Sequence, residues 1–587
     1  MSTSPLSLAE ATARLTVPGQ MFETERVVVR DVELTVWKNA PRDLRHVLDA
    51  SLNYGSRDFL VYEQRRVSFE RHYRLAATVA RRLADLGVRK GDRVSIAARN
   101  SPEWVMAFWG IVAAGAVAVP LNAWWTTDEL AYGLEDSGTS VLFVDDERLE
   151  RVRGRLGDLT SLNSVVVFDE DGVAATSSAP SNGTRLLTFT ELVGDVAADA
   201  APPALDASPD DDATMFYTSG TTGRPKGAVG THRNAATNLM NLFFRGQVAA
   251  LRSATEDAAR APSANPHSIL LSVPLFHATG CLATMMSSTL AGSSLVMMHH
   301  FDAGRALRVI ESERITAFGG VPTVVMQILD HPDFARVDTS SVVSVTYGGA
   351  PAPPDLVRRI RAAFPGSQAG NGYGLTETSA GVCFNIGVDY VSRPDSCGPV
   401  VPVCEAAIVP EGFEGLEPPH DRPRGPHALG ELWIKGPSVV RGYWKRPDVT
   451  ATTFTRGWLH TGDIARIDDD GFVYIVDRAK DMIIRGGENV YSVIVEAAIF
   501  EHPDVSDCAV VGVPHATLGE EVAAVVILRA GRVVEAEEIS RHVALRLARF
   551  EVPTKVIFRS GALPRNPQGK VLKRQLRDEL VTARDAG

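Results

Sequence analysis

Cysteine is scarce in this chain: five occur among 587 residues, and none belongs to a CxxC pair or a Cys/His cluster. The pattern therefore suggests neither a zinc site nor a disulfide framework. A chain without them is typical of a reducing compartment, and we expect a cytoplasmic protein. The cysteines are Cys281, Cys383, Cys397, Cys404 and Cys508.

Long runs of basic residues are also missing, and the formal net charge is −11. Binding to a phosphate backbone needs a positive surface, so nucleic acid is not expected as a partner. Met1–Pro18 lacks the basic segment and following apolar segment that mark a signal peptide, which agrees with a cytoplasmic location.

No apolar run in the sequence is long enough to span a bilayer. The best candidate, Val105–Leu121, is uncharged for 17 residues, whereas a helical span needs about 20. Gly110, Gly115 and Pro120 interrupt this run. We therefore predict a buried helix that leads into a buried strand, and no integral membrane association.

The chain does have the composition of an ordinary globular protein, with 45% hydrophobic and 22% charged residues. Single cores stop growing near about 250–300 residues, so this length predicts more than one domain. Short β-rich runs alternate with helix-like stretches such as Phe69–Leu86 and Thr127–Glu135, which favours an α/β fold with largely parallel sheets. The β-rich runs are Val94–Ala97, Ser140–Val144, Ser164–Phe168 and Ser344–Tyr347.

The pattern changes after Asp477 to that of a compact unit of about 110 residues. We predict a large N-terminal layered α/β domain over residues 1–477 and a small α+β C-terminal domain over residues 478–587. In the small domain we expect strands at Cys508–Val513 and Ala523–Leu528, and helices near Ser492–Phe500 and Ala536–Leu547.

A loop rich in glycine and threonine, residues 218–227, follows the apolar run Met215–Tyr217. Three glycines, of which Gly227 is the last, allow tight turns and a close approach of the backbone to a ligand. The hydroxyl and N–H groups of the loop can hold phosphate oxygens, and Lys226 adds a positive charge. The Walker pattern does not fit, because Gly227 follows the lysine. The sequence therefore predicts a phosphate-binding loop of another type; an ordinary surface turn is the weaker alternative.

This loop resembles the phosphate loop of the adenylate-forming superfamily, which groups acyl- and aryl-CoA synthetases, peptide-synthetase adenylation domains and beetle luciferase. Other segments of that superfamily follow in order and cover nearly the whole chain, most like those of fatty-acid or carboxylic-acid CoA ligases. A chance match of several motifs in the same order is far less credible than a chance match of one motif. They are Pro274–Gly280, Tyr347–Pro351, Asn371–Thr378, Gly457–Asp463, Asp477–Asp481 and Pro564–Lys570.

The resemblance implies a nucleotide site for ATP and Mg²⁺. Glu377 would be the Mg²⁺ ligand, since this cation is held by one or two carboxylates plus phosphate oxygens, with Thr221 as a second candidate. Thr376 would touch the α-phosphate. The phosphate loop would use Thr218, Ser219, Gly220, Thr221, Thr222, Gly223 and Lys226.

Two further segments would hold the adenosine. A backbone without side chains can lie flat against a base, and a ring face and a polar edge can complete the contact. Asp463 offers two oxygens to the ribose hydroxyls, and Arg478 can donate to the sugar or to phosphate. The adenine segments are Gly348, Gly349, Ala350, Pro351, Asn371, Gly372, Tyr373 and Gly374.

Two residues would serve the chemistry most directly. Lys570 matches the lysine that the small domain of the superfamily carries into the active site, where an ammonium offsets repulsion between the attacking carboxylate and the α-phosphate. His277 matches a residue between the nucleotide and acyl pockets that gates access to the acid. A histidine among apolar residues is otherwise more often packed in a core.

The resemblance also implies a moving small domain. It would rotate at Lys480 between an adenylating and a thioester-forming pose, and Gly486 and Gly487 would then line the pantetheine tunnel. The sequence departs from the superfamily pattern at Ser492, where a proline is common, and at Ile494, where a glutamate is usual. The local polar contacts of the small domain are therefore open.

The predicted function is an ATP-dependent acid:CoA ligase, an acyl-CoA synthetase that forms acyl-AMP and pyrophosphate and then acyl-CoA and AMP. Alternatives are a ligase that loads an acyl carrier protein or stops at acyl-AMP, and a non-catalytic nucleotide- or acyl-binding protein. The intact charged set argues against the last. Nothing in the sequence indicates the acid or the oligomeric state. Acyl-pocket candidates are Phe276, Gly319, Gly320, Val321, Met326, Tyr347 and Gly372.

Overall fold

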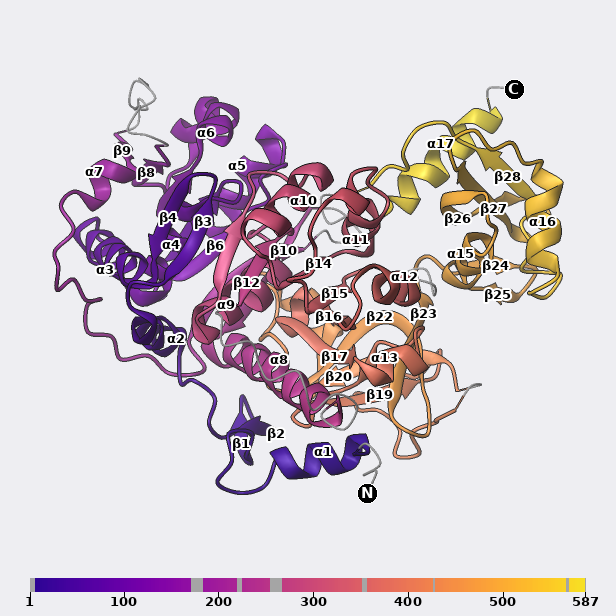
Figure 1. The fold of residues 1–587 in the computed structure, drawn as a ribbon, viewed down its shortest axis with the longest axis horizontal. Coiled ribbons are helices and arrows are strands. Elements are labelled where there is room, and N and C mark those ends of the chain that lie inside the picture. The colour runs from indigo at the N-terminus through magenta and orange to yellow at the C-terminus, as the bar shows by residue number, and fades with distance from the viewer. Residues whose placement is uncertain are drawn as a thin grey trace.

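The computed structural model describes residues 6–169, 183–218, 224–253, 267–350, 356–425, 428–565 and 570–585. Figure 1 shows a large body and, at its right, a smaller lobe built from the end of the chain. The lobe has hydrophobic clusters of its own. The predicted α/β fold with a large N-terminal and a separate small C-terminal domain is thus confirmed, while the boundary at residue 477 stays a prediction, since β23 (Phe472–Arg478) runs through it.

One sheet of the large domain has the strand order β11-β10-β6-β5-β7-β8-β9. All its pairs are parallel except β10 with β11. The inner strands are buried along their whole length, as expected where helices cover both faces of a parallel sheet. The strands are β5 (Arg93–Ala97), β6 (Val117–Pro120), β7 (Val141–Val144), β8 (Ser164–Val167), β9 (Arg185–Thr188), β10 (Asp212–Thr218) and β11 (Lys226–Thr231).

A second sheet carries the strands that will position the site, in the order β17-β16-β15-β14-β12-β13-β3-β4. It is parallel except at its two edges, β16 with β17 and β3 with β4. The strands are β3 (Asp58–Tyr62), β4 (Arg65–Ser68), β12 (Ser268–Leu271), β13 (Ser294–Met297), β14 (Ala317–Gly320), β15 (Ser344–Gly348), β16 (Gln368–Leu375) and β17 (Ala380–Ile386).

The third sheet of the large domain is antiparallel, a departure from the parallel pattern of the first two. Its order is β18-β23-β22-β20-β19, with β21 beside β22. Antiparallel strands can be joined by a short turn, as β22 and β23 are here, whereas parallel strands need crossovers. The strands are β18 (Gly398–Pro399), β19 (Glu405–Val409), β20 (Gly430–Lys435), β21 (Phe454–Thr455), β22 (Trp458–Ile467) and β23. An N-terminal hairpin, β1 (Thr24–Val29) and β2 (Val32–Trp37), lies apart from these sheets.

The small domain is a sheet of order β25-β24-β27-β26, with β28 beside β27, packed with helices. Its central hairpin is longer than predicted, because β26 and β27 pair from Val505 to Leu528 across one tight connection. The helix predicted at Ser492–Phe500 is confirmed as α15. The other elements are β24 (Ile483–Arg485), β25 (Glu488–Val490), β26 (Val505–His515), β27 (Gly519–Leu528), β28 (Lys555–Phe558), α16 (Ala536–Ala544) and α17 (Lys573–Asp585).

Capping residues mark the ends of helices in the large domain. In α5 (Thr127–Ser137), Thr126 and Glu129 form a reciprocal capping box and Gly138 ends the helix in the left-handed conformation. The remaining helices are α1 (Leu8–Leu15), α2 (Leu44–Ala50), α3 (Phe69–Asp85), α6 (Asp146–Val152), α7 (Phe189–Val193), α8 (His232–Ser253), α9 (Met286–Ala291), α10 (Ala303–Ser312), α11 (Pro322–Leu329), α12 (Leu356–Ala363), α13 (Val388–Ser392) and α14 (Pro447–Thr453).

The apolar run Val105–Leu121 is a buried helix followed by a buried strand, as predicted. Ser101 caps α4 (Pro102–Ala113), every residue of that helix is buried, and β6 follows. Within the described ranges, no helix combines the length and the apolar character that crossing a bilayer requires.

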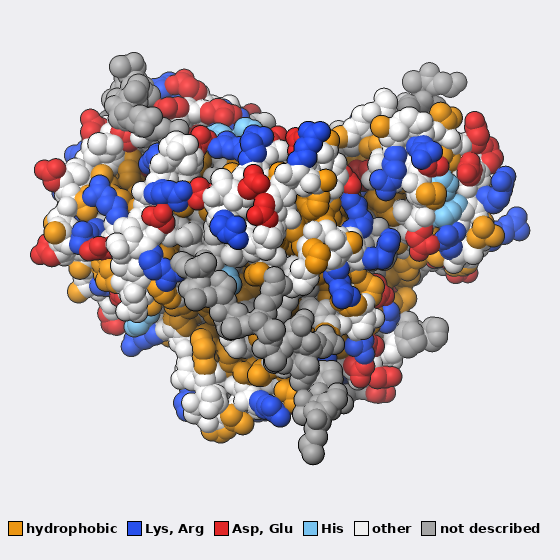
Figure 2. Space-filling model, in the orientation of Figure 1, with side chains coloured by type: hydrophobic (Ala, Val, Ile, Leu, Met, Phe, Trp, Pro, Cys, Tyr) orange, Lys and Arg blue, Asp and Glu red, His pale blue; other side chains and the backbone are white. Residues whose placement is uncertain are grey.

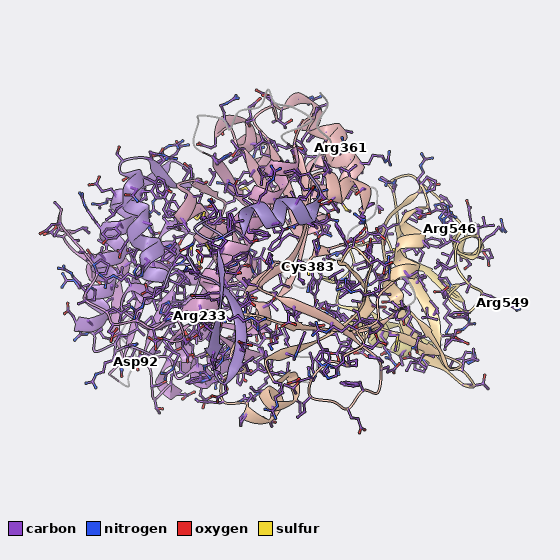
Figure 3. All side chains as sticks on the ribbon, turned by 90° about the horizontal axis from the view of Figure 1, so that it is seen from below. Asp92, Arg233, Arg361, Cys383, Arg546 and Arg549 are labelled. Carbon is purple, nitrogen blue, oxygen red and sulfur yellow. The ribbon has the colours of Figure 1, made fainter. Side chains whose placement is uncertain are left out.

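Charges of both signs are interspersed over the face of the molecule in Figure 2. In the view from below, Cys383 of β17 lies between the side of the molecule that carries Asp92 and the small domain that carries Arg546 (Figure 3). All five cysteines are free thiols, and four of them are buried. Burial raises the pKa of the Cys383 thiol, which keeps it protonated.

Candidate active site

A cavity of about 1300 Å³ opens beside the carboxyl ends of β12, β14 and β15 and extends to the small domain. Parallel strands that end at one edge bring side chains from distant segments together, and clefts form there. The cavity is lined by these predicted site residues: Thr218, Lys226, His277, Gly348, Gly349, Asn371, Gly372, Tyr373, Gly374, Thr376, Glu377, Arg478 and Lys570.

Some predicted residues do not line the cavity. Asp463 lies behind it and contacts two residues that do line it. Ala350, Lys480, Gly486 and Gly487 are not part of its lining. Ser219, Gly220, Thr221, Thr222, Gly223 and Pro351 lie outside the described residues.

The two ends of the predicted phosphate loop face each other. Thr218 ends β10 and Lys226 begins β11, and the antiparallel register pairs these two residues. The Lys226 ammonium lies 5.1 Å from the centre of the Tyr443 ring, within cation–π range. The strand pairing therefore delivers one cation to the cavity at the base of the loop.

Glu377 lies in the short turn Thr376–Thr378, directly after β16, and is half-buried. Its Oε1 accepts a 2.7 Å hydrogen bond from the hydroxyl of Tyr443. Burial and this carboxylate raise the pKa of Tyr443, so the phenol stays a donor. Sequence reasoning missed Tyr443, because it stands outside the superfamily segments and reaches Glu377 only through the fold.

On the ribose side of the cavity, Asp463 of β22 is paired with Arg478 of β23 by the antiparallel register. Arg478 Nε lies 3.0 Å from Asp463 Oδ1, and the Tyr373 hydroxyl donates to Oδ2 at 2.6 Å. Burial alone would lower the pKa of Arg478, but the Asp463 carboxylate raises it. Each carboxylate oxygen thus already has a partner, an ion pair at Oδ1 and a hydrogen bond at Oδ2, and a sugar hydroxyl would use their remaining lone pairs or displace a partner.

The adenine segments are held close by missing side chains. Gly348 pairs with Gly372 across β15 and β16, and a Cβ on Gly348 would lie 2.4 Å from the Gly372 carbonyl oxygen. Gly349 adopts φ +77°, a conformation that favours glycine. Glycine at these two positions is therefore required by the backbone itself, before any ligand is considered.

Lys570 comes from the small domain and is half-buried in the cavity. Burial and the Arg478 guanidinium lower its pKa, the carboxylates of Asp463 and Glu377 partly oppose this, and the resulting pKa is about 8. Lys570 lines the same cavity as predicted site residues of the large domain. The geometry therefore joins the last predicted segment of the chain to the nucleotide site.

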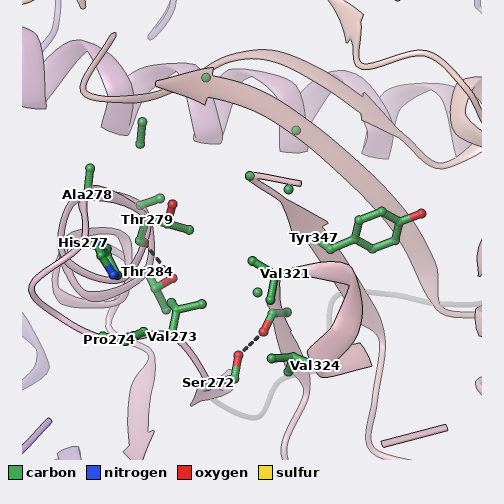
Figure 4. Close-up of a pocket in the computed structure, with 18 of the residues that line it drawn as sticks. Ser272, Val273, Pro274, His277, Ala278, Thr279, Thr284, Val321, Val324 and Tyr347 are labelled. Atoms are coloured by element: carbon green, nitrogen blue, oxygen red, sulfur yellow. Dashed lines mark hydrogen bonds between the residues drawn. The ribbon is translucent and has the colours of Figure 1, made fainter. Parts of the chain in front are cut away.

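His277 precedes the π-helix η4 (Thr279–Met285) and faces the same cavity. Burial and, to a smaller extent, the nearby Lys570 ammonium together lower its pKa to about 3, so its ring is neutral at neutral pH. Figure 4 shows the cavity between η4, with Ala278, Thr279 and Thr284, and the segment of Val321 and Val324.

The turn from 479 to 482 joins the two domains. Lys480 is exposed, and no backbone hydrogen bond from its N–H occurs in the described structure, whereas Asp481 N–H donates to Arg478 O. Gly486 and Gly487, with φ of +63° and +88°, lie exposed in the turn after β24. In this pose neither glycine lines the cavity, so their role in a pantetheine tunnel remains a prediction.

One of the two departures from the superfamily pattern, Ser492, takes part in a largely buried polar network. The Ser492 hydroxyl and N–H both donate to Asp477 Oδ2, the former at 2.7 Å. Lys573 Nζ donates to Ser492 Oγ at 2.6 Å and pairs with Glu496 at 2.8 Å. Sequence reasoning missed Lys573 entirely. Ile494 is half-buried on the same helix.

Comparison with known proteins agrees with this architecture. Residues 48–444 match the AMP-binding enzyme family, and residues 494–570 match the AMP-binding enzyme C-terminal domain. A feruloyl-CoA synthase of Amycolatopsis sp is 36% identical, covering 86% of this chain and 92% of the relative. The long-chain-fatty-acid–CoA ligase FadD13 of Mycobacterium tuberculosis is 34% identical, covering 88% and 93%.

Among solved structures, the anthranilate CoA ligase AuaEII in complex with anthranoyl-AMP superposes with a TM-score of 0.80 at 25% identity. The match covers 93% of this chain and 99% of that one. Fold, cavity and both matched regions therefore place the chain in the AMP-binding enzyme family, the adenylate-forming enzymes that the order of its motifs predicted.

Proposed function

We infer that this chain is an ATP-dependent acid:CoA ligase. A carboxylate attacks the α-phosphorus of ATP, giving acyl-AMP and pyrophosphate; the CoA thiol then attacks the acyl carbon, giving acyl-CoA and AMP. The observation that carries this inference is that Lys570 of the small domain shares a cavity with Lys226 and Glu377 of the large domain. The similarity to relatives named as CoA ligases, which extends over nearly the whole length of those relatives, supports it.

We propose that the adenylation step uses charges of this chain to hold two anions together. Lys570 and Lys226 would offset the repulsion between carboxylate and triphosphate, with Thr376 at the α-phosphate. Glu377 fits Mg²⁺, because its Oε1 is held by Tyr443 while no hydrogen bond to Oε2 occurs among the described residues. When bound there, the cation would neutralise phosphate charge.

The second half-reaction needs a thiol at the acyl carbon, where Lys570 now stands. We propose that the small domain turns at Lys480, withdraws Lys570 and brings Gly486 and Gly487 to the pantetheine path. His277, neutral and at the junction of the nucleotide and acid parts of the cavity, would gate the thiol's approach. A carrier-protein thiol is the alternative acceptor.

Replacing Glu377 tests its proposed role as the Mg²⁺ ligand. We expect Glu377→Ala to raise the Mg²⁺ concentration for half-maximal adenylation by ~10-fold or more, because a carboxylate ligand is lost. Pyrophosphate exchange titrated with Mg²⁺ measures this. Tyr443→Phe is the matched variant: it keeps the carboxylate and removes only its donor, so a smaller shift is expected. An unchanged Mg²⁺ requirement in Glu377→Ala would make Glu377 a structural residue.

The part of the cavity that we propose for the acid, called here the acid chamber, is lined by apolar side chains and by polar groups without a full charge. His277 is neutral, the Ser272 hydroxyl donates to the Gly319 carbonyl oxygen, and Thr284 Oγ1 donates to Thr279 O at 3.2 Å (Figure 4). We define the chamber by Ser272, Val273, His277, Ala278, Thr279, Thr284, Val321 and Val324.

We propose that the substrate is an apolar monocarboxylic acid. A second carboxylate would be desolvated in the chamber without a cation to pair with it, which is costly. Relatives named for feruloyl, 4-coumarate and long-chain fatty acids support an apolar acid body. The small side chains Ala278 and Thr284 leave width for a ring or branched chain beside η4.

An acid panel tests both the reaction and the substrate class. Wild-type enzyme should release pyrophosphate and form CoA thioesters with apolar monocarboxylic acids, and prefer them at least ~10-fold in kcat/KM over dicarboxylic acids of equal size. Thr284→Phe should lose ~10-fold or more with ring acids and keep butanoate, while Thr284→Val, which conserves volume, keeps both. No pyrophosphate release with any acid would favour the non-catalytic alternative; thioester only on a carrier protein would favour the carrier-loading one.

A further inference from the structure

A chain of hydrogen bonds crosses the junction between the two domains. It starts at Lys573, the first residue of α17, whose ammonium donates to Ser492 Oγ at 2.6 Å. The Ser492 hydroxyl donates in turn to Asp477 Oδ2 at 2.7 Å. Asp477 belongs to β23 of the third sheet, on the large-domain side of Lys480, whereas Ser492 and Lys573 lie beyond it.

This series of hydrogen bonds is largely buried. Asp477 is 2% exposed and Ser492 is fully buried. Lys573 also pairs with Glu496 at 2.8 Å, and Glu496 Oε1 accepts from Val510 N–H. Although burial alone would lower the pKa of Lys573, the carboxylates of Glu496 and Asp477 raise it, so its charge is kept. Removing a partner from such a buried network leaves a polar group without compensation.

The same network reaches the reacting end of the small domain. Lys570 stands three residues before Lys573, and the described residues near it are joined by the Arg565–Val571 bridge and by the Leu572 N–H to Pro564 O bond of 2.8 Å. On the other side, Asp477 directly precedes Arg478, which pairs with Asp463. One connected path therefore joins the residues next to Lys570 to the ribose side of the cavity.

We propose that Ser492 and Lys573 are positioning residues for Lys570, which hold the small domain on Asp477 in the adenylating pose and release it for acyl transfer. The proposal rests on the proposed two-step function. Rotation at Lys480 would leave Asp477 with the large domain and carry Ser492 and Lys573 away, so the contact stabilises one pose and not the other. A contact made in one pose alone shifts the equilibrium between poses by its own free energy.

The two half-reactions, measured separately, test this. We expect Asp477→Asn and Ser492→Ala to lower the kcat of acid-dependent pyrophosphate exchange about tenfold, with the KM for ATP unchanged, because the proposed ATP contacts lie mainly in the large domain. Single-turnover thioester formation from supplied acyl-adenylate should be unchanged or faster. Glu521→Gln is the matched control: Glu521 pairs with Lys555 at 2.6 Å wholly inside the small domain.

The outcomes separate cleanly. A purely structural role would lower both half-reactions in parallel, together with the melting temperature, and would overturn the proposal. So would equal losses in Glu521→Gln, or unchanged exchange in both network variants. Absence of exchange in the wild-type enzyme would instead count against the proposed function, so the two failures are distinguishable.

Discussion

Lys570→Ala is expected to lower acid-dependent pyrophosphate exchange by ~10²-fold or more while thioester formation from supplied acyl-adenylate falls far less. The reason is that a positioned charge facing developing negative charge typically contributes this much in a water-poor site. Lys570 is half-buried beside Arg478 and within electrostatic reach of Asp463 and Glu377. The Lys570 charge is expected to act while the acid carboxylate attacks the α-phosphate. After pyrophosphate has left, no second anion approaches the phosphate, so the charge is needed less in thioester formation.

The pH dependence gives a sharper control for the same residue. With a pKa lowered to about 8, Lys570 of the nucleotide-free enzyme is charged below that pH and neutral above it. The kcat/KM of adenylation for ATP should therefore fall as pH rises through about 8. Lys570→Arg keeps its charge at higher pH, so its falling limb should move upward. Equal loss of both half-reactions in Lys570→Ala would sink the assignment.

Lys480→Pro is expected to have the opposite effect to Lys570→Ala. It should leave adenylation nearly unchanged and lower the rate of acyl transfer to CoA by ~10-fold or more. Proline holds φ near −65° and removes an N–H. In the present pose that N–H makes no hydrogen bond within the described structure, and Lys480 is not among the residues with positive φ, so proline removes no backbone hydrogen bond from this pose. A second pose reached by rotation at this residue would be hindered by the fixed φ.

Pyrophosphate exchange and single-turnover thioester formation are the measurements for this variant. Lys480→Ala is its control, because it removes the charged side chain and leaves the backbone free to rotate. If Lys480 only decorates a surface turn, proline changes stability slightly and affects both half-reactions alike. That result would place the hinge elsewhere and leave the Lys570 assignment intact.

Local pattern was enough for much of the fold. The alternation of β-rich runs and helices predicted the parallel sheets, and the apolar run after Ser101 predicted the buried α4 and β6. Pattern did not predict the antiparallel third sheet, since short strands there have no signature of their pairing direction. The small-domain hairpin was predicted too short, because strand length depends on the partner strand.

The candidate site divides in the same way. Ordered motifs named part of the cavity lining, including its charged residues Lys226, Glu377 and Lys570. They did not name Tyr443, which supports Glu377, or Lys573, which carries the network at the domain junction. Tyr443 and Lys573 both lie outside the segments that resemble the superfamily motifs. Only their contacts in the structure therefore identified them.

The sequence by itself determined which chemical groups this protein can bring to a site: a predicted phosphate-binding loop, a carboxylate predicted to bind Mg²⁺, a lysine near the C-terminus, and the order in which they occur. The tertiary structure decided which of these groups meet. Tyr443 and Glu377 are 66 residues apart, Ser492 and Lys573 are 81 apart, and Tyr373 and Asp463 are 90 apart. Residue type and spacing record short-range preferences, whereas such distant pairs form only when sheets and domains pack, because packing alone brings them within hydrogen-bond distance.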